Sequence, residues 1–152
     1  MSISRSGSSV AMALARICVG VMFLFFAQYK LMHREFAHGG YEKYVNEYTQ
    51  QTSLHFYRPV LRATLKYPAF SGYAVGVAEA LIGLSMLLGL WVRPFSILGA
   101  LFMLNLTFST WYLPAGSAYW MYAGRQLDHI PLLLLFLVFF VHNAGTSLGL
   151  DR

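Results

Sequence analysis

The sequence has little cysteine and little charge. Of its 152 residues only Cys18 is a cysteine, and 11% are charged, against about 25% in a soluble domain. A single cysteine excludes an intrachain disulfide, a Cys-x-x-Cys redox pair and a cysteine metal site. The net charge is +5, but no basic block is present that could follow a phosphate backbone, so we do not expect nucleic-acid binding. The 57% hydrophobic content indicates a membrane protein instead.

Motifs of known catalytic chemistry are also missing. The sequence has no Gly-rich phosphate loop, no Ser–His–Asp order and no metal-binding helix motif. His129 and His142 are separated by the spacing that stacks two haems across a membrane, but no other apolar stretch has a histidine to complete such a site. We therefore expect no intrinsic haem and no metal.

Four apolar stretches are long enough to cross a bilayer, which takes about 20 residues. They cover approximately residues 10–29, 70–91, 95–112 and 130–148. Lipid offers no partner to an open backbone, so each stretch should be a helix. We expect the first to be retained, because it is longer than the apolar region of a signal peptide and Arg16 interrupts it. The prediction is an all-α integral membrane protein, a four-transmembrane-helix antiparallel bundle forming a single domain over residues 1–152. The short turn "VRP" predicts that the second and third spans form a tight antiparallel hairpin.

The segment between the first two spans, about residues 30–68, is too long for a simple connector. Aromatic residues recur in it near helical spacing: Tyr41, Tyr44 and Tyr48. Arg58, Arg62 and Lys66 follow at intervals of four, which would place three cations on one stripe of a helix. We predict two short amphipathic helices at the membrane interface, the second touching anionic lipids. A solvated loop without a role is the alternative.

Lysine and arginine are more frequent in this segment and in the loop before the fourth span than on the other side. The positive-inside rule therefore places these two loops in the cytoplasm and both termini outside.

Polar residues inside the spans form two predicted layers. Counting helical rise from the membrane surface puts Glu79 and Asn105 near the midplane, and Arg16 and His142 closer to one surface. The long side chain of Arg16 could then reach Glu79. A carboxylate at this depth must be paired, hydrogen-bonded or protonated. The cluster either fixes helix register or forms a site for a polar headgroup or for protons, and we favour the site because intramembrane charges are costly and usually functional.

Three segments carry a resemblance to a known family. "AEALIGLSMLLGLWVRP" resembles the Glu-containing second span of the DoxX/DoxD family, and "LGALFMLNLTFS" resembles its third span, with Asn105 at a recurrent asparagine. "HNAGTSLGLDR" resembles the closing segment of the family. "FFAQYKL" resembles a Gly-x-x-Lys-Leu signature, although Ala27 stands where glycine is usual; Lys30 carries over. The family comprises four-helix membrane proteins that include the small membrane subunit of thiosulfate:quinone oxidoreductase.

This resemblance implies a role in a membrane oxidation–reduction reaction that involves a quinone. Together with the polar residues it predicts a site with Glu79 and Asn105 as catalytic residues and four cofactor-binding residues: Arg16, Lys30, Arg93 and His142. Electrons would come from a larger membrane oxidoreductase or from a bound reductant, and a homo-oligomer is compatible with the sequence. The expected location is the prokaryotic cytoplasmic membrane. Two alternatives remain: a non-catalytic accessory subunit of a larger complex, and a small transporter or lipid-binding protein gated by the segment 30–68.

Overall fold

The computed structural model describes residues 5–113 and 116–151, and this part of the chain contains helices and turns but no strand. Its long helices are α1 (Arg5–Met32), α4 (Pro68–Leu88) and α5 (Val92–Ser109). Among the described residues, three helical stretches are long and apolar enough to cross a membrane: Ser9–Met32, Pro68–Leu88 and Val92–Ser109. The all-helical fold class and the first three predicted spans are therefore confirmed at this level.

The fourth predicted span, 130–148, is longer than the helix that the structure contains. Helix α7 runs only from Ile130 to Val141, 12 residues, or about 18 Å, against a hydrocarbon core of about 30 Å. The helix stops because Asn143 has a φ of 47°, outside the right-handed helical region. After it, the turn η3 (Ala144–Thr146) leads into a tail that folds back onto the end of α4. The prediction of four spanning helices is not confirmed.

The segment between α1 and α4 is helical, as the sequence predicts. It contains η1 (Phe36–Gly40), α2 (Tyr41–Gln51), η2 (His55–Tyr57) and α3 (Arg58–Thr64). Because α3 ends at Thr64, Lys66 lies beyond it, and the predicted stripe of three cations on one helix is wrong. Apolar residues of α2 and α3 pack against η1 in a small core of their own.

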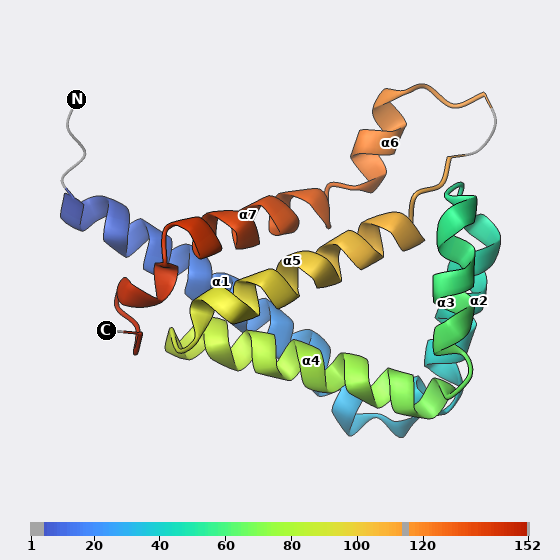
Figure 1. Cartoon of the computed structure of the whole chain (residues 1–152), viewed down its shortest axis with the longest axis horizontal. Helices are drawn as coiled ribbons and strands as arrows, with labels where there is room; N and C mark the ends of the chain where they lie inside the picture. Colours follow the sequence, from blue (N-terminus) through green and yellow to red (C-terminus); the bar gives the residue numbers. More distant parts are fainter. Residues whose placement is uncertain (1–4, 114–115, 152) are drawn as a thin grey trace.

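The turn between α4 and α5 is short, as predicted, but the two helices do not stay together. Gly89 ends α4 with a φ of 66°, and α5 starts at Val92. From this turn α4 and α5 diverge like the arms of a V, and α2 and α3 lie across its open end (Figure 1). Helix α1 packs along α4 and α7 along α5. The prediction of a tight hairpin therefore holds for the turn and not for the helices.

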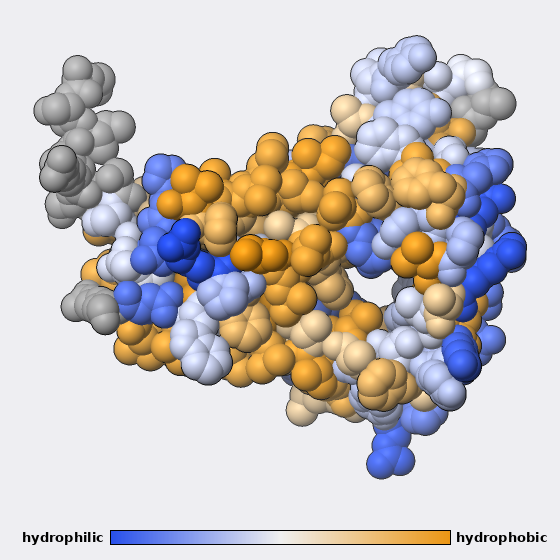
Figure 2. All heavy atoms as spheres, in the orientation of Figure 1, coloured by the Kyte–Doolittle hydropathy of each residue, from blue (hydrophilic) through white to orange (hydrophobic). Residues whose placement is uncertain are grey.

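The main core joins all four long or apolar helices. It includes Phe23 of α1, Met86 of α4, Met103 of α5, and Phe136 and Phe139 of α7. On the outside, apolar side chains gather over α4, α5 and α7, whereas hydrophilic side chains gather along α2 and α3 (Figure 2). A protein with an apolar flank and a polar end is suited to a bilayer, with the polar end at the interface.

The short helix α6 (Trp120–Arg125) lies between α5 and α7 in the chain.

Candidate functional site

Three glycines bring α1 and α4 close together. A Cβ atom on Gly20 would lie 2.6 Å from the backbone nitrogen of Leu87, and one on Gly83 would lie 3.0 Å from the carbonyl oxygen of Gly20. A Cβ atom on Gly76 would lie 2.9 Å from the Leu31 side chain. Small residues permit this kind of close backbone approach in membrane helices. Since Gly76 and Gly83 lie three residues before and four residues after Glu79, all three share the face of α4 that meets α1.

Glu79 is consequently paired with Lys30 at the end of α1. The Lys30 ammonium donates to Oε1 of Glu79 in an ion pair, and the side chains are 19% and 4% exposed. The other carboxylate oxygen, Oε2, is buried and has no hydrogen-bond partner among the described residues. The Lys30 nitrogen also lies 5.5 Å from the centre of the Phe36 ring. The sequence predicted that a carboxylate as deep in the membrane as Glu79 needs a partner or a proton, and in the structure its partner is Lys30.

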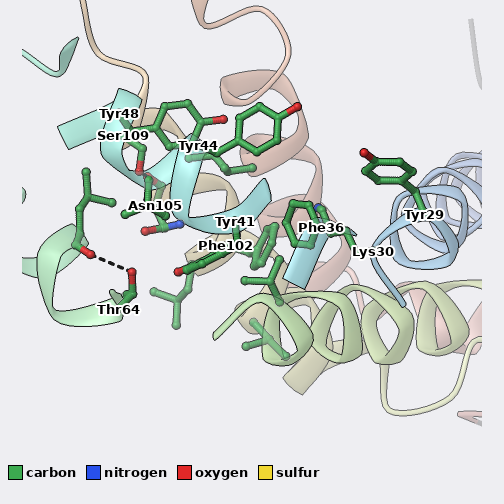
Figure 3. Close-up of a pocket in the computed structure, with 16 residues that line it drawn as sticks. Tyr29, Lys30, Phe36, Tyr41, Tyr44, Tyr48, Thr64, Phe102, Asn105 and Ser109 are labelled. Carbon is green, nitrogen blue, oxygen red and sulfur yellow. Dashed lines mark hydrogen bonds between the residues drawn. The ribbon is translucent and has the colours of Figure 1, made fainter. Parts of the chain in front are cut away.

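A cavity of about 520 Å³ lies on one side of this pair, between the arms of the V and the α2–α3 layer. We call it the aromatic cavity, because six aromatic residues line it: Tyr29, Phe36, Tyr41, Tyr44, Tyr48 and Phe102. Lys30, Thr64, Asn105 and Ser109 supply polar groups to its wall (Figure 3). An opening between α5 and the α2–α3 layer is visible on the surface at this position (Figure 2). The size falls within the range of about 300–1,000 Å³ typical of small-molecule sites.

Asn105 lies on the wall of the aromatic cavity. Its side-chain carbonyl accepts a hydrogen bond from the hydroxyl of Tyr57. This leaves the amide NH₂ group as a potential donor. Asn105 and Glu79 line different cavities, so the predicted layer of these two residues is divided between two neighbouring sites.

A second cavity, of about 530 Å³, lies on the other side of Lys30. We call it the carboxylate cavity, because Glu79 and Asp128 both line it. Its apolar wall comes from α1, α5, α7 and the turn before α7: Met22, Phe23, Phe26, Phe102, Met103, Leu106, Leu127 and Leu132. Four residues line both cavities: Lys30, Tyr48, Phe102 and Leu106. The two cavities are therefore neighbours; Lys30 lies on their common wall, and its partner Glu79 lines the carboxylate cavity alone.

Tyr48 and His129, which lie on these walls outside the spanning helices, both have a pKa that burial shifts. Burial raises the pKa of Tyr48, with smaller contributions from Tyr44 and Glu47, so its hydroxyl keeps its proton over a wider pH range than that of a free tyrosine. Burial lowers the pKa of His129, an effect that neighbouring Asp128 partly opposes. Burial thus disfavours the charged form of His129, whose ring lies on the wall of the carboxylate cavity with Nδ1 3.4 Å from Oε1 of Gln126.

Arg16 does not meet Glu79. It is fully buried, and its guanidinium donates to the carbonyl oxygens of Met86, Ser147 at 3.3 Å and Leu148 at 3.4 Å. Arg16 precedes Lys30 by 14 residues on one helix, about 21 Å of rise, so only one of the two can lie level with Glu79. Arg16 instead connects α1 to the end of α4 and to the C-terminal tail.

The other two predicted cofactor-binding residues lie outside both cavities. Arg93 is exposed, with its guanidinium 5.0 Å from the centre of the Phe140 ring. His142 is exposed at the end of α7, so the predicted layer of Arg16 and His142 does not form either. Of the six predicted site residues, the structure brings Glu79 and Lys30 into contact and places Asn105 in the adjoining cavity.

Sequence reasoning missed the aromatic wall that α2 supplies. Tyr41, Tyr44 and Tyr48 showed helical spacing, but the pattern was interpreted as a surface helix. The three residues do share one face, and that face lines a cavity. Asp128 and His129 were missed as well, because nothing local in the sequence relates them to Glu79. No group of three or more potential metal ligands occurs among the described residues.

The comparisons with known proteins identify a family over the part of the chain that contains α1, α4 and α5. The DoxX family model matches residues 11–111, a range that includes Lys30, Glu79 and Asn105. No curated protein and no solved structure matches the chain significantly. The closing segment, whose sequence also resembles the family, lies outside the matched range. The three apolar helices and this match indicate an integral membrane protein, and the chain belongs to the DoxX family.

Proposed function

We propose that this chain is the quinone-binding membrane subunit of an oxidoreductase, with the quinone headgroup in the aromatic cavity beside the Lys30–Glu79 pair. The observation that carries the proposal is the Lys30–Glu79 ion pair, whose lysine lines both cavities. A quinone is an apolar ring with two carbonyl acceptors, and it needs an apolar slot with a few convergent donors. When bound, it would supply two-electron chemistry accompanied by proton uptake.

The residues of the aromatic cavity fit such a ring. Aromatic side chains provide large, flat apolar contacts for a planar ligand, and Phe36 of η1 and Phe102 of α5 both line this cavity. The Lys30 ammonium and the Asn105 amide are donors suited to the two carbonyl oxygens. A hydrogen bond from a charged donor is about twice as strong as a neutral one, so Lys30 should contribute most to orienting the headgroup. Glu79 lines the neighbouring carboxylate cavity and contacts the site through its ion pair with Lys30.

A partner supplies the electrons in this proposal. The sequence has one cysteine and no histidine arrangement suited to a haem pair, so a larger membrane oxidoreductase is the expected source. Extraction of the native complex in mild detergent should recover such an enzyme together with the chain. Recovery of the chain alone would contradict the dependence on a partner.

The test of the site is quinone binding by the purified protein in lipid nanodiscs. A short-tailed quinone is titrated while intrinsic tyrosine and tryptophan fluorescence is followed. We expect Lys30→Met to weaken binding by about tenfold or more, because it removes a hydrogen bond from a charged donor. Lys43→Met is the matched control, since Lys43 is exposed on α2, and it should bind like the unchanged protein.

Equal affinity of both variants would contradict the proposed site. Size-exclusion chromatography and circular dichroism of each variant establish that it remains folded. Should Lys30→Met not fold, Leu98→Phe provides the second test, because Leu98 lines the aromatic cavity and is exposed on α5. A larger side chain there should reduce quinone affinity by filling the cavity without disturbing the ion pair.

A further inference from the structure

The two cavities differ in hydrogen-bonding character. The aromatic cavity presents donors, the Lys30 ammonium and the Asn105 amide. The carboxylate cavity presents two carboxyl groups, of which Glu79 lies deep in the protein and Asp128 is exposed. A carboxylate accepts hydrogen bonds only. A ligand that is itself an acceptor would therefore suit the first cavity, and a ligand that donates would suit the second.

The unpaired oxygen of Glu79 is the central observation. Glu79 is 3% exposed, its Oε1 is occupied by Lys30, and its Oε2 has no partner among the described residues. A buried carboxylate oxygen without a hydrogen bond is costly to the folded protein. Glu79 lines the carboxylate cavity, so a rotation of its carboxyl group would present Oε2 to a donor located there.

We propose that the carboxylate cavity binds the hydroxyl group of a ring-bearing apolar ligand, with Oε2 of Glu79 as the acceptor. This inference rests on the proposed function, and it assigns the cavity to the reduced, dihydroxy form of the quinone. Reduction converts each carbonyl acceptor of the ring into a hydroxyl donor. The same headgroup then changes its preference from the donors of the aromatic cavity to the acceptor on the other side of Lys30.

The remaining wall restricts the ligand further. Phe23, Phe26 and Phe102 offer contacts for a flat ring. Two carboxyl groups face the cavity and the one ammonium, Lys30, is already paired, so an anionic phosphate or sulfur oxyanion is disfavoured. His129 is half-buried on this wall, and burial lowers its pKa, which disfavours a positive charge that could balance an anion. An uncharged hydroxyl also occurs on diacylglycerol, a second source that the experiment must distinguish.

The experiment compares two redox-inert probes that differ by one hydrogen-bond donor. The first is 4-methoxyphenol with a decyl tail, and the second is its methyl ether. Binding is measured by isothermal titration calorimetry on the full chain in nanodiscs, with dioleoylglycerol as a third probe. We expect the phenol to bind about tenfold or more tightly than the ether, the difference expected for one hydrogen bond to a charged group. In Glu79→Gln that preference should fall to threefold or less. Tighter binding of dioleoylglycerol than of the phenol would overturn the assignment to a ring.

Cavity-filling variants show which cavity is responsible. Leu132 lines only the carboxylate cavity and Leu98 only the aromatic cavity. Leu132→Phe should weaken phenol binding by about tenfold, whereas Leu98→Phe should leave it unchanged. The reverse pattern would overturn the proposal. This pair keeps Glu79 and Lys30 intact, so it decides the matter even if Glu79→Gln does not fold.

The outcomes for the two proposals are separable. Lys30-dependent quinone binding without a preference for the phenol would refute the hydroxyl site and leave the proposed function standing. A Glu79-dependent preference for the phenol without any quinone binding would support the hydroxyl site and refute the quinone assignment. Equal binding of phenol and ether by the unchanged protein overturns the inference directly.

Discussion

The Lys30–Glu79 pair makes a quantitative prediction that a double-mutant cycle can test. Lys30→Met removes the ammonium and keeps the length of the side chain, while Glu79→Gln removes the carboxylate charge and keeps its shape. Breaking a buried ion pair at one partner costs about 3–5 kcal/mol. The Lys30 side chain is 19% exposed, so we expect about 3 kcal/mol, the lower end of that range, for Lys30→Met.

The double variant should be less destabilised than the two single changes together. Removing both charges leaves no unpaired buried ion, and replacement of a buried pair by neutral groups is often nearly neutral. We therefore expect a coupling energy of at least about 2 kcal/mol. Lys43 and Glu47 provide the control: they lie four residues apart on α2 and are both exposed. Their coupling should not exceed about 0.5 kcal/mol.

The measurement is reversible unfolding in mixed micelles, followed by circular dichroism as a denaturing detergent replaces a mild one. All four variants of each cycle are compared at the same pH and lipid content. A coupling energy at Lys30 and Glu79 as small as that of the control would refute the buried pair, and with it the argument that the pair organises the two cavities.

Three further outcomes follow from other parts of the structure. Asp151 accepts hydrogen bonds from the backbone nitrogens of residues 91 and 92, at 2.6 and 2.8 Å, where α5 begins. Asp151→Ala should therefore lower the unfolding free energy by about 2–3 kcal/mol. An equal loss from Leu150→Ala, a change at an exposed residue of the same tail, would show that the tail and not the carboxylate is responsible. Gly20→Ala should destabilise the protein strongly, since its Cβ would meet backbone, whereas Gly124→Ala, with nothing within 4 Å, should not; thermal unfolding of the two variants compares them. Because burial lowers the pKa of His129, the unfolded chain takes up the proton first, so stability should fall as the pH drops through about 6.5, by at most about 1.4 kcal/mol per pH unit. His129→Gln should flatten this part of the stability curve, and an unchanged curve would contradict the burial of the ring.

The predictions of membrane-spanning helices were correct where helix formation depends only on the composition and length of the segment itself. Each long apolar stretch must become a helix in lipid whatever surrounds it, so α1, α4 and α5 follow from composition and length. The same reasoning failed for the fourth stretch, 130–148. Its apolar residues continue past Val141, but the left-handed backbone of Asn143 and the docking of the tail on the end of α4 stop the helix. These contacts join residues about 60 positions apart and leave no local pattern.

Part of the candidate site could also be predicted from the sequence, and part of it depends on the tertiary structure. The depth of Glu79 and its need for a partner were predictable, because burying a charge is costly wherever it occurs. The identity of the partner was not, since Arg16 and Lys30 are both cations on the first helix, and only the register set by Gly20, Gly76 and Gly83 places Lys30 level with Glu79. The resemblance to the family did single out Lys30, without indicating what it contacts.

The sequence by itself determined the class of this protein, its three long apolar helices and the presence of an expensive carboxylate within one of them. These properties depend on the transfer of side chains and backbone between water and lipid, which each segment undergoes separately. Only the tertiary structure decided that α4 and α5 diverge, that α2 covers the opening with its tyrosines, and that Lys30 separates an aromatic cavity from one lined by carboxylates. Cavities are the space that packing leaves between elements, so they depend on distances between residues that the linear order does not contain.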